Sequence, residues 1–235
     1  MNPEFRNKNL FLFTLIIAVI SQTTFSYAQS VTIDCCGIEK TVPSFLEAKD
    51  TVFTNQILIS SHVLKPIMQS PCPLEIRLYL IDADKAGIVF VIKCLNNTMS
   101  VERISTDLVY DTIALKGHYI KTLGSDHHKG AYILNYIDQL KLSHYPTWNS
   151  FIDDLIKNHF FDLTGDPDLT GLVLQKNPNT RIIRGDNART LVEIKIGNHY
   201  RNILFRTAFD PLPENVKEYD YLQHCLSQIM SLTNP

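Results

Sequence analysis

Two stretches of alternating apolar and polar residues, each folded back by a short connection, most constrain the fold of this chain. The clearer one runs from Thr190 to Phe205 and is interrupted by Gly197-Asn198. That pair suits a two-residue type II′ turn because glycine comes first. Pairing across the turn sets the register, with three predicted pairs of partners: Val192 with Ile203, Ile194 with Arg201, and Thr190 with Phe205. The alternation predicts an apolar face and an opposite face with these residues: Glu193, Lys195, Tyr200, Asn202 and Arg206.

A second hairpin is predicted over residues 74–94. Leu74 to Ile81 alternates strictly, and Ile88 to Cys94 is rich in β-branched and aromatic residues, a composition typical of strands. The first of these strands is expected to be half-buried, with the polar face carrying Glu75, Arg77 and Tyr79. In this register Cys94 comes to the open end of the hairpin, close to Cys72, so we expect a Cys72–Cys94 disulfide.

Four other segments carry features of helices. The clearest has apolar residues at steps of three and four from Trp148 to Phe160, with Thr147 as its N-cap. Trp148 is expected in the core, and His159 is expected to be packed and hydrogen-bonded. The other predicted helices cover residues 216–232, residues 130–142, and a segment that starts at the capping box Ser44–Glu47.

Hairpins that alternate with helices, without βαβ regularity, favour an α+β fold. We therefore expect an antiparallel sheet built from hairpins and packed by helices, one of them C-terminal. A further strand is predicted around residues 109–115.

The first 28 residues predict a signal peptide. Arg6 and Lys8 give a basic start, an apolar run follows from Leu10 to Ile20, and Ser26-Tyr27-Ala28 suits cleavage before Gln29. The expected location is therefore outside the cytosol, periplasmic or secreted, with no transmembrane segment after cleavage. Residues 29–235 are expected to form a single α+β domain. A sub-domain boundary, if the domain divides, would lie near 143–147.

All five cysteines follow the predicted leader, and an exported chain favours disulfides over free thiols. If two bonds form, one thiol is left over. Besides Cys72–Cys94, Cys225 on the inner face of the C-terminal helix is expected to bond Cys35 or Cys36. Cys-x-x-Cys and Cys/His pairs at zinc spacing are absent from the sequence, so neither a metal site nor a cofactor is expected.

Charge and motifs narrow the class of function. The formal net charge is −2 without a dense Lys/Arg stripe, which disfavours nucleic acid as a partner. Nucleophile motifs and phosphate-binding loops are also absent from the sequence. The favoured interpretation is a non-catalytic binding or interaction module whose partner is a protein or an envelope component.

The alternative interpretation is a small metal-dependent or histidine-using hydrolase centred on the loop of residues 124–130. This loop gathers Asp126, His127 and His128, which could supply a general base or metal ligands. Adjacent histidines on an extended segment point to opposite sides, so only one would face a given site. A polar surface connection is the simpler explanation of the loop.

The second half of the chain has a recognisable order of elements. A Trp-led helix (148–160) runs into the carboxylate-rich loop 162–168, followed by the hairpin 191–205 and the helix 216–232. This order resembles that of small exported α+β proteins of unknown function from bacteria of the Bacteroidetes group, over roughly the last 90 residues. The resemblance implies the fold class and export, and it implies no activity.

Overall fold

The computed structural model describes residues 28–46, 64–82, 87–109, 119–125, 128–142, 145–163, 165–184, 188–205 and 207–232. Residues 1–27 of the predicted leader lie outside these ranges, as does most of the strand predicted around 109–115. No helix within the described residues is long and apolar enough to cross a membrane.

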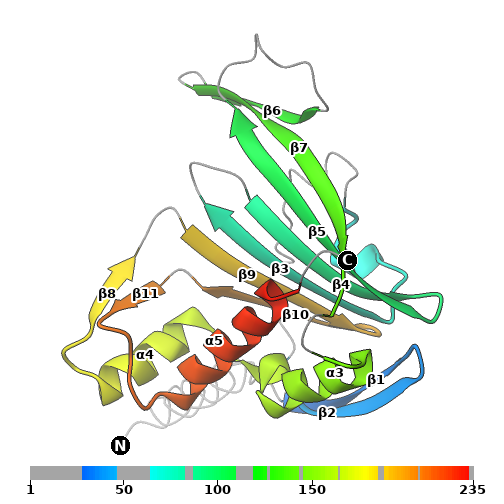
Figure 1. Cartoon of the computed structure of the whole chain (residues 1–235). Helices are drawn as coiled ribbons and strands as arrows, with labels where there is room; N and C mark the ends of the chain where they lie inside the picture. Colours follow the sequence, from blue (N-terminus) through cyan, green and yellow to red (C-terminus); the bar gives the residue numbers. More distant parts are fainter. Residues whose placement is uncertain are drawn as a thin grey trace, which may run out of the picture.

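A seven-stranded antiparallel sheet forms the largest part of the described structure, in the order β10-β9-β3-β4-β5-β7-β6 (Figure 1). Its strands in chain order are β3 (Leu74–Asp82), β4 (Gly87–Leu95), β5 (Thr98–Val109), β6 (Tyr119–Ser125), β7 (His128–Leu140), β9 (Ala188–Ile196) and β10 (His199–Phe205). Together with the helices described below, this confirms the α+β class.

Two small antiparallel pairs and several helices accompany the large sheet. The pairs are β1 (Ala28–Cys35) with β2 (Ile38–Leu46), and β8 (Arg181–Arg184) with β11 (Thr207–Asp210). The α-helices are α3 (Trp148–Lys157), α4 (Asp166–Lys176) and α5 (Lys217–Met230), and the short 3₁₀ turns are η1 (Ile67–Gln69) and η2 (Phe160–Asp162). In Figure 1 the helices and the β1–β2 hairpin gather by the lower part of the sheet, whereas β6 and the adjoining end of β7 extend away.

The main core lies between the sheet and the elements that gather beside it. Alternate residues of the central strands are fully buried there, among them Leu74, Ile76, Ile92, Val192 and Ile194. They belong to one hydrophobic cluster with the buried residues of the helices, including Phe151, Leu155, Phe160, Leu222 and Ile229. Burial of such side chains is the main stabilising contribution to the fold.

Both predicted hairpins are confirmed. The β9–β10 partners are those expected, including Val192 with Ile203 and Ile194 with Arg201. Gly197 has a φ of +57°, as the first position of a type II′ turn requires. In the β3–β4 hairpin, Leu74 pairs with Cys94, so Cys94 lies at the open end of the hairpin as predicted.

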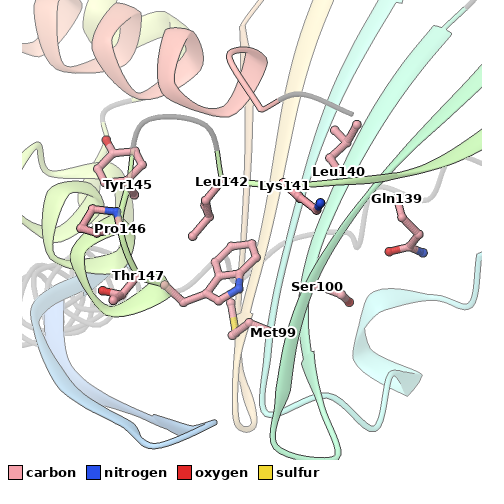
Figure 2. A pocket seen from close by; sticks show the side chains of 10 residues that line it. Met99, Ser100, Gln139, Leu140, Lys141, Leu142, Tyr145, Pro146 and Thr147 are labelled. Atoms are coloured by element: carbon pink, nitrogen blue, oxygen red, sulfur yellow. The ribbon is translucent and has the colours of Figure 1, made fainter. Parts of the chain in front are cut away.

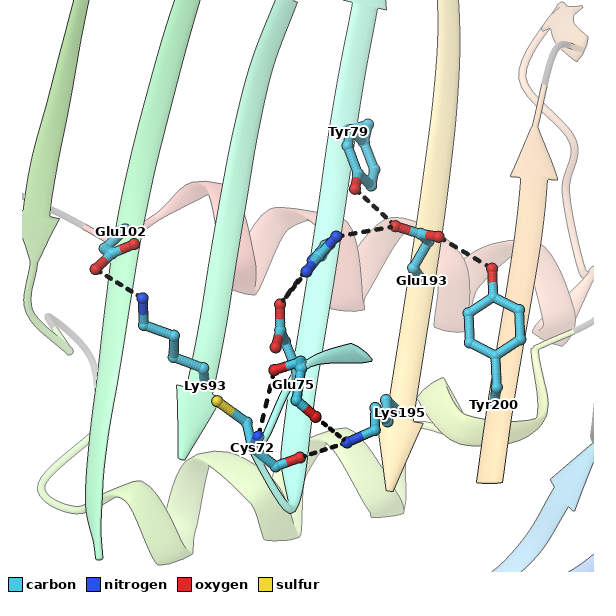
Figure 3. A network of polar contacts seen from close by, with 10 residues as sticks. Cys72, Glu75, Tyr79, Lys93, Glu102, Glu193, Lys195 and Tyr200 are labelled. Atoms are coloured by element: carbon cyan, nitrogen blue, oxygen red, sulfur yellow. Dashed lines mark hydrogen bonds and ion pairs between the residues drawn. The ribbon is translucent and has the colours of Figure 1, made fainter. Parts of the chain in front are cut away.

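The expectation that β3 is only half-buried is wrong. Glu75, Arg77 and Tyr79 are 3%, 1% and 0% exposed, so both faces of the strand are covered. Glu193, on the adjacent strand β9 of the sheet, is buried as well. The polar face forms a buried network instead of a solvated surface (Figure 3).

The side chains of this network bond mainly to one another. Arg77 Nε donates to Glu75 Oε1 at 2.6 Å, and the Tyr79 hydroxyl donates to Glu193 Oε2 at 2.6 Å. Burial raises the pKa of Glu193, an effect that the bonds from Tyr79 and the nearby Arg77 charge only partly offset. On the same face, Lys195 Nζ donates to the backbone carbonyls of Ser70 and Cys72, both at 2.8 Å.

Two of the predicted helices are corrected. Ser44, Phe45 and Leu46 belong to strand β2, where pairing with β1 and full burial of Phe45 outweigh the capping-box pattern. The rest of that predicted helix, residues 47–63, lies outside the described residues.

Residues 130–140 likewise belong to a strand, β7, and not to a helix. The β5–β7 register is irregular between Ser105 and Thr106, whose partners are Tyr136 and Leu134. Asn135 has no partner in this ladder. Residues 133 and 136 are therefore three apart in the chain, whereas their partners on β5, Asp107 and Ser105, are only two apart. A bulge of this kind gives a strand the apolar spacing expected of a helix.

The other helix predictions hold with changed bounds. Thr147 caps α3 and forms a reciprocal capping box with Ser150, while α5 buries its expected stripe. The expectation for His159 is confirmed in part: its ring packs against Tyr221 with centroids 4.8 Å apart, and its Nδ1 is bonded to Asp162 Oδ2 at 3.3 Å. The residue is not on the buried stripe of α3, however, because the helix ends before it and it is exposed in the left-handed region at φ +57°. Helix α4 was not predicted, although Gly165 and Pro167 mark its start.

The disulfide predictions are also corrected. Cys36 is bonded to Cys94, with the Cα atoms 6.6 Å apart, whereas Cys35, Cys72 and Cys225 are free thiols. The β1–β2 hairpin packs beside the sheet, so its turn brings Cys36 to the end of β4. Cys225 instead donates to the backbone carbonyl of Asn158 at 3.6 Å.

Candidate functional site

The candidate site is a pocket of about 430 Å³ where the ends of two sheet strands meet the segment that leads into α3 (Figure 2). The start of β5, the end of β7 and residues 145–148 form its walls. Its lining residues are Met99, Ser100, Gln139, Leu140, Lys141, Leu142, Tyr145, Pro146, Thr147 and Trp148. Pockets of this volume suit small organic ligands.

The pocket combines an apolar wall with polar groups at its rim. Met99 and Leu140 are buried, whereas Gln139 and Lys141 are exposed. Gln139 Nε2 donates to Glu102 Oε1 at 2.9 Å, and that carboxylate also binds Lys93 Nζ at 2.9 Å. The orientation of the Gln139 amide is therefore set by a neighbouring ion pair.

The two aromatic residues of the pocket are held by one core side chain. The rings of Tyr145 and Trp148 both meet Phe151 edge-on, with centroid distances of 5.2 Å and 5.7 Å. Phe151 itself is fully buried in the first turn of α3. Edge-to-face pairs at these distances are favourable, so the aromatic wall is fixed before any ligand arrives.

Asp154 also stabilises the aromatic wall, through a hydrogen bond from Tyr145. One of its carboxylate oxygens, Oδ2, accepts bonds from the Tyr145 hydroxyl at 2.6 Å and from His224 Nε2 at 2.9 Å. Its Oδ1 accepts from Asn158 Nδ2 at 3.1 Å. Partial burial tends to raise the pKa of Asp154, but the bonds from Tyr145 and His224 outweigh it and lower the pKa below its usual value.

The carboxylate form of Asp154 is therefore the stable one, and it ties the segment before α3 to both α3 and α5. In turn, burial and the bond to Asp154 raise the pKa of Tyr145, which keeps its hydroxyl protonated as a donor.

His224 and the Asp154 carboxylate lie close to a thiol, that of Cys225, but this thiol does not have the properties of a nucleophile. Cys225 follows His224 in the chain, but it is fully buried. Burial, with a further contribution from Asp154, raises the pKa of its thiol to about 12. Reactive cysteines need a lowered pKa and access to solvent, so the geometry fits a structural brace better than a catalytic dyad.

Of the residues proposed for a hydrolase site, the structure describes only His128. Asp126 and His127 are outside the described residues, and His128 begins β7 opposite Ser125 of β6. The described residues of the predicted loop, 124–125 and 128–130, therefore belong to strands β6 and β7. His128 and Gln139 lie near opposite ends of β7, roughly 35 Å apart at the rise of an extended strand, so the structure does not join this loop to the pocket.

Sequence reasoning missed the pocket because its parts come from separate elements. Trp148 was assigned to the core, and the structure leaves it half-buried, packed against the core and lining the pocket at once. A Trp at the first position of a capped helix, two residues after Pro146, was the available signal.

Comparison with known proteins adds no assignment: no family model, curated protein or solved structure matches this chain. The resemblance to exported Bacteroidetes proteins stays a prediction.

Proposed function

We propose that this protein is an exported, non-catalytic binding module and that the pocket at Tyr145–Trp148 is its binding site. The ligand class that fits is a small amphipathic anion, with an apolar ring or chain for the pocket wall and an acidic group for Lys141. An envelope component of that chemistry would meet an exported protein in its own compartment.

The observation that carries the proposal is the fixed aromatic wall. Phe151 holds both aromatic rings and Asp154 holds the Tyr145 hydroxyl, so little ordering remains to be done on binding. Sites prepared in this way lose less conformational entropy when the ligand arrives. Lys141 adds an exposed ammonium donor at the rim.

The chain offers a direct assay, because Trp148 is its only tryptophan. The probe is 1-anilinonaphthalene-8-sulfonate, which joins an apolar ring system to an anionic group. Titration of the folded protein should show saturable dye fluorescence with energy transfer from Trp148. Lys141→Gln should weaken binding by about tenfold, the factor for losing about 1.4 kcal/mol of a charge-assisted contact.

The matched control is Lys65→Gln, which removes another exposed lysine, outside the pocket lining. It should leave the titration unchanged. Equal loss in both lysine variants, or dye binding without energy transfer from Trp148, would show that the pocket is not the binding site.

Export is tested separately by N-terminal sequencing of the protein from the exported fraction of its native host. A mature chain that begins at Gln29 supports the predicted cleavage. A chain that retains residues 1–28 and stays in the cytosolic fraction contradicts it.

A further inference from the structure

Three sulfur atoms meet at the junction between the β1–β2 hairpin and the large sheet. The Sγ atoms of Cys35, Cys36 and Cys94 all lie within 4.8 Å of one another. Cys36 and Cys94 are joined as a disulfide, and Cys35 is a free thiol beside that bond. Within the described part of the chain, this group offers only sulfur ligands.

The turn between β1 and β2 explains why two adjacent cysteines face the same point. Side chains of consecutive residues in a strand point to opposite sides, so Cys35 and Cys36 would diverge if both were extended. Cys36 instead has a φ of +57° and Gly37 a φ of +73°. A left-handed conformation is uncommon outside glycine, asparagine and aspartate, and here it directs both sulfur atoms towards Cys94.

The surroundings of the group are apolar. Cys35 and Cys94 are buried, and Cys36 is half-buried. Several thiolates at this place would repel one another, and a bound cation would reduce that repulsion.

We propose that reduction of the Cys36–Cys94 disulfide converts this group into a three-thiolate site for a soft monovalent cation, Cu(I). A thiol or phosphine reductant supplies two electrons, and Cys36 and Cys94 each take up one proton as the S–S bond breaks. On binding, Cys35, Cys36 and Cys94 each lose a proton to solvent, and three S–Cu bonds form.

The choice of metal follows from the ligands. Thiolates are soft ligands that select Cu(I) and Zn²⁺ over harder cations. Structural zinc sites are four-coordinate, and Cys72 is outside the group of three. Three converging sulfur atoms therefore match a three-coordinate Cu(I) centre.

The experiment measures Cu(I) binding by competition with the chromogenic chelator bicinchoninate, under anaerobic conditions and with excess reductant removed. The reduced protein should take one Cu(I) per chain, and the disulfide-bonded protein should take none. Cys35→Ala should weaken binding at least tenfold, since even an outer partner of a metal ligand contributes that much.

Cys225→Ala is the matched control, because it also leaves four cysteines and removes a buried thiol outside the group. Its Cu(I) affinity should equal that of the unaltered protein. The disulfide of Cys35→Ala remains intact before reduction, so Trp148 emission of the oxidised variant verifies that it folds.

Three results would overturn the proposal. The first is equal Cu(I) binding by Cys35→Ala and Cys225→Ala. The second is a reduced protein that unfolds and binds no copper. The third is loss of binding in Cys72→Ala, which would replace the three-sulfur site by a four-sulfur one.

Discussion

Arg201 carries a positive charge into the main core, and its replacement tests how that charge is stabilised. The residue lies on the core-facing side of β10 and is buried. Its Nη1 donates to the backbone carbonyl of Phe161 at 2.6 Å, and its Nη2 donates to the carbonyl of Leu163. The guanidinium thus satisfies two carbonyls around the turn η2.

The magnitude follows from two opposing contributions. Hydrogen bonds from a charged donor contribute about 1.5–3 kcal/mol each, so the pair contributes about 3–6 kcal/mol. Burial lowers the pKa of Arg201 from its usual value to about 10, with Asp162 partly opposing the change. A fall of that size corresponds to a cost of about 3 kcal/mol for holding the charge in the core.

The net contribution of Arg201 to the free energy of unfolding is therefore small. Two substitutions, Arg201→Met and Arg201→Lys, test this balance. Arg201→Met loses both bonds but also the cost of the buried charge, so we expect a loss of about 1.5 kcal/mol. Arg201→Lys keeps a buried charge with one bond at most, because an ammonium lacks the planar fork. We expect it to lose about 2 kcal/mol, so the conservative change should be no better than methionine.

Urea unfolding followed by Trp148 emission measures both losses, provided that the m-values match. The controls are Arg181→Met and Arg181→Lys at an exposed position of β8, where changes within about 0.5 kcal/mol are expected. A lysine variant at position 201 as stable as the unaltered protein would refute the reasoning.

Three further perturbations have outcomes that the structure specifies. Because the pKa of Asp154 is lowered on folding, this carboxylate stabilises the folded protein above about pH 4, and the stabilisation is lost as the pH falls through the folded pKa. The free energy of unfolding in urea should therefore change less between pH 7 and pH 3 for Asp154→Asn than for the unaltered protein. Cys94→Ala removes the Cys36–Cys94 bond across a separation of 58 residues, and calorimetry under non-reducing conditions should show a loss of about 4 kcal/mol. Under reducing conditions, which open the bond in the unaltered protein as well, the two proteins should differ by much less. Thr147→Ala removes the α3 cap and should cost about 1 kcal/mol in the same measurement; no loss would mean that the reciprocal bonds with Ser150 do not stabilise the helix.

The β-hairpins were predictable because their information is local. Gly197 sets the turn, and a two-residue turn leaves one register for the strands that flank it. The observed partners of Val192 and Ile194 therefore follow from the sequence. The same holds for α3, since Thr147 and the apolar spacing both act within a few residues.

Burial of the second sheet face was not predictable from alternation. The pattern Glu75, Arg77, Tyr79 indicates which residues share a face, but it does not tell whether that face meets water. The structure buries all three and pairs the charges of Arg77 and Glu75 at 2.6 Å between Nη2 and Oε1. Glu193 completes the network by accepting a bond from Tyr79, and it comes from β9, a strand adjacent in the sheet but far away in the sequence.

The sequence alone determined the class of fold, the two hairpins with their registers, and the helices whose caps and apolar stripes are continuous. These follow from steric and hydrogen-bonding rules that act over a few neighbouring residues. Only the tertiary structure decided that Cys36 reaches Cys94, that residues 130–140 form a strand, and that Tyr145 and Trp148 line a pocket with β5 and β7. Each of these depends on which segments pack together in space, and packing energy can override a local preference worth about 1 kcal/mol or less.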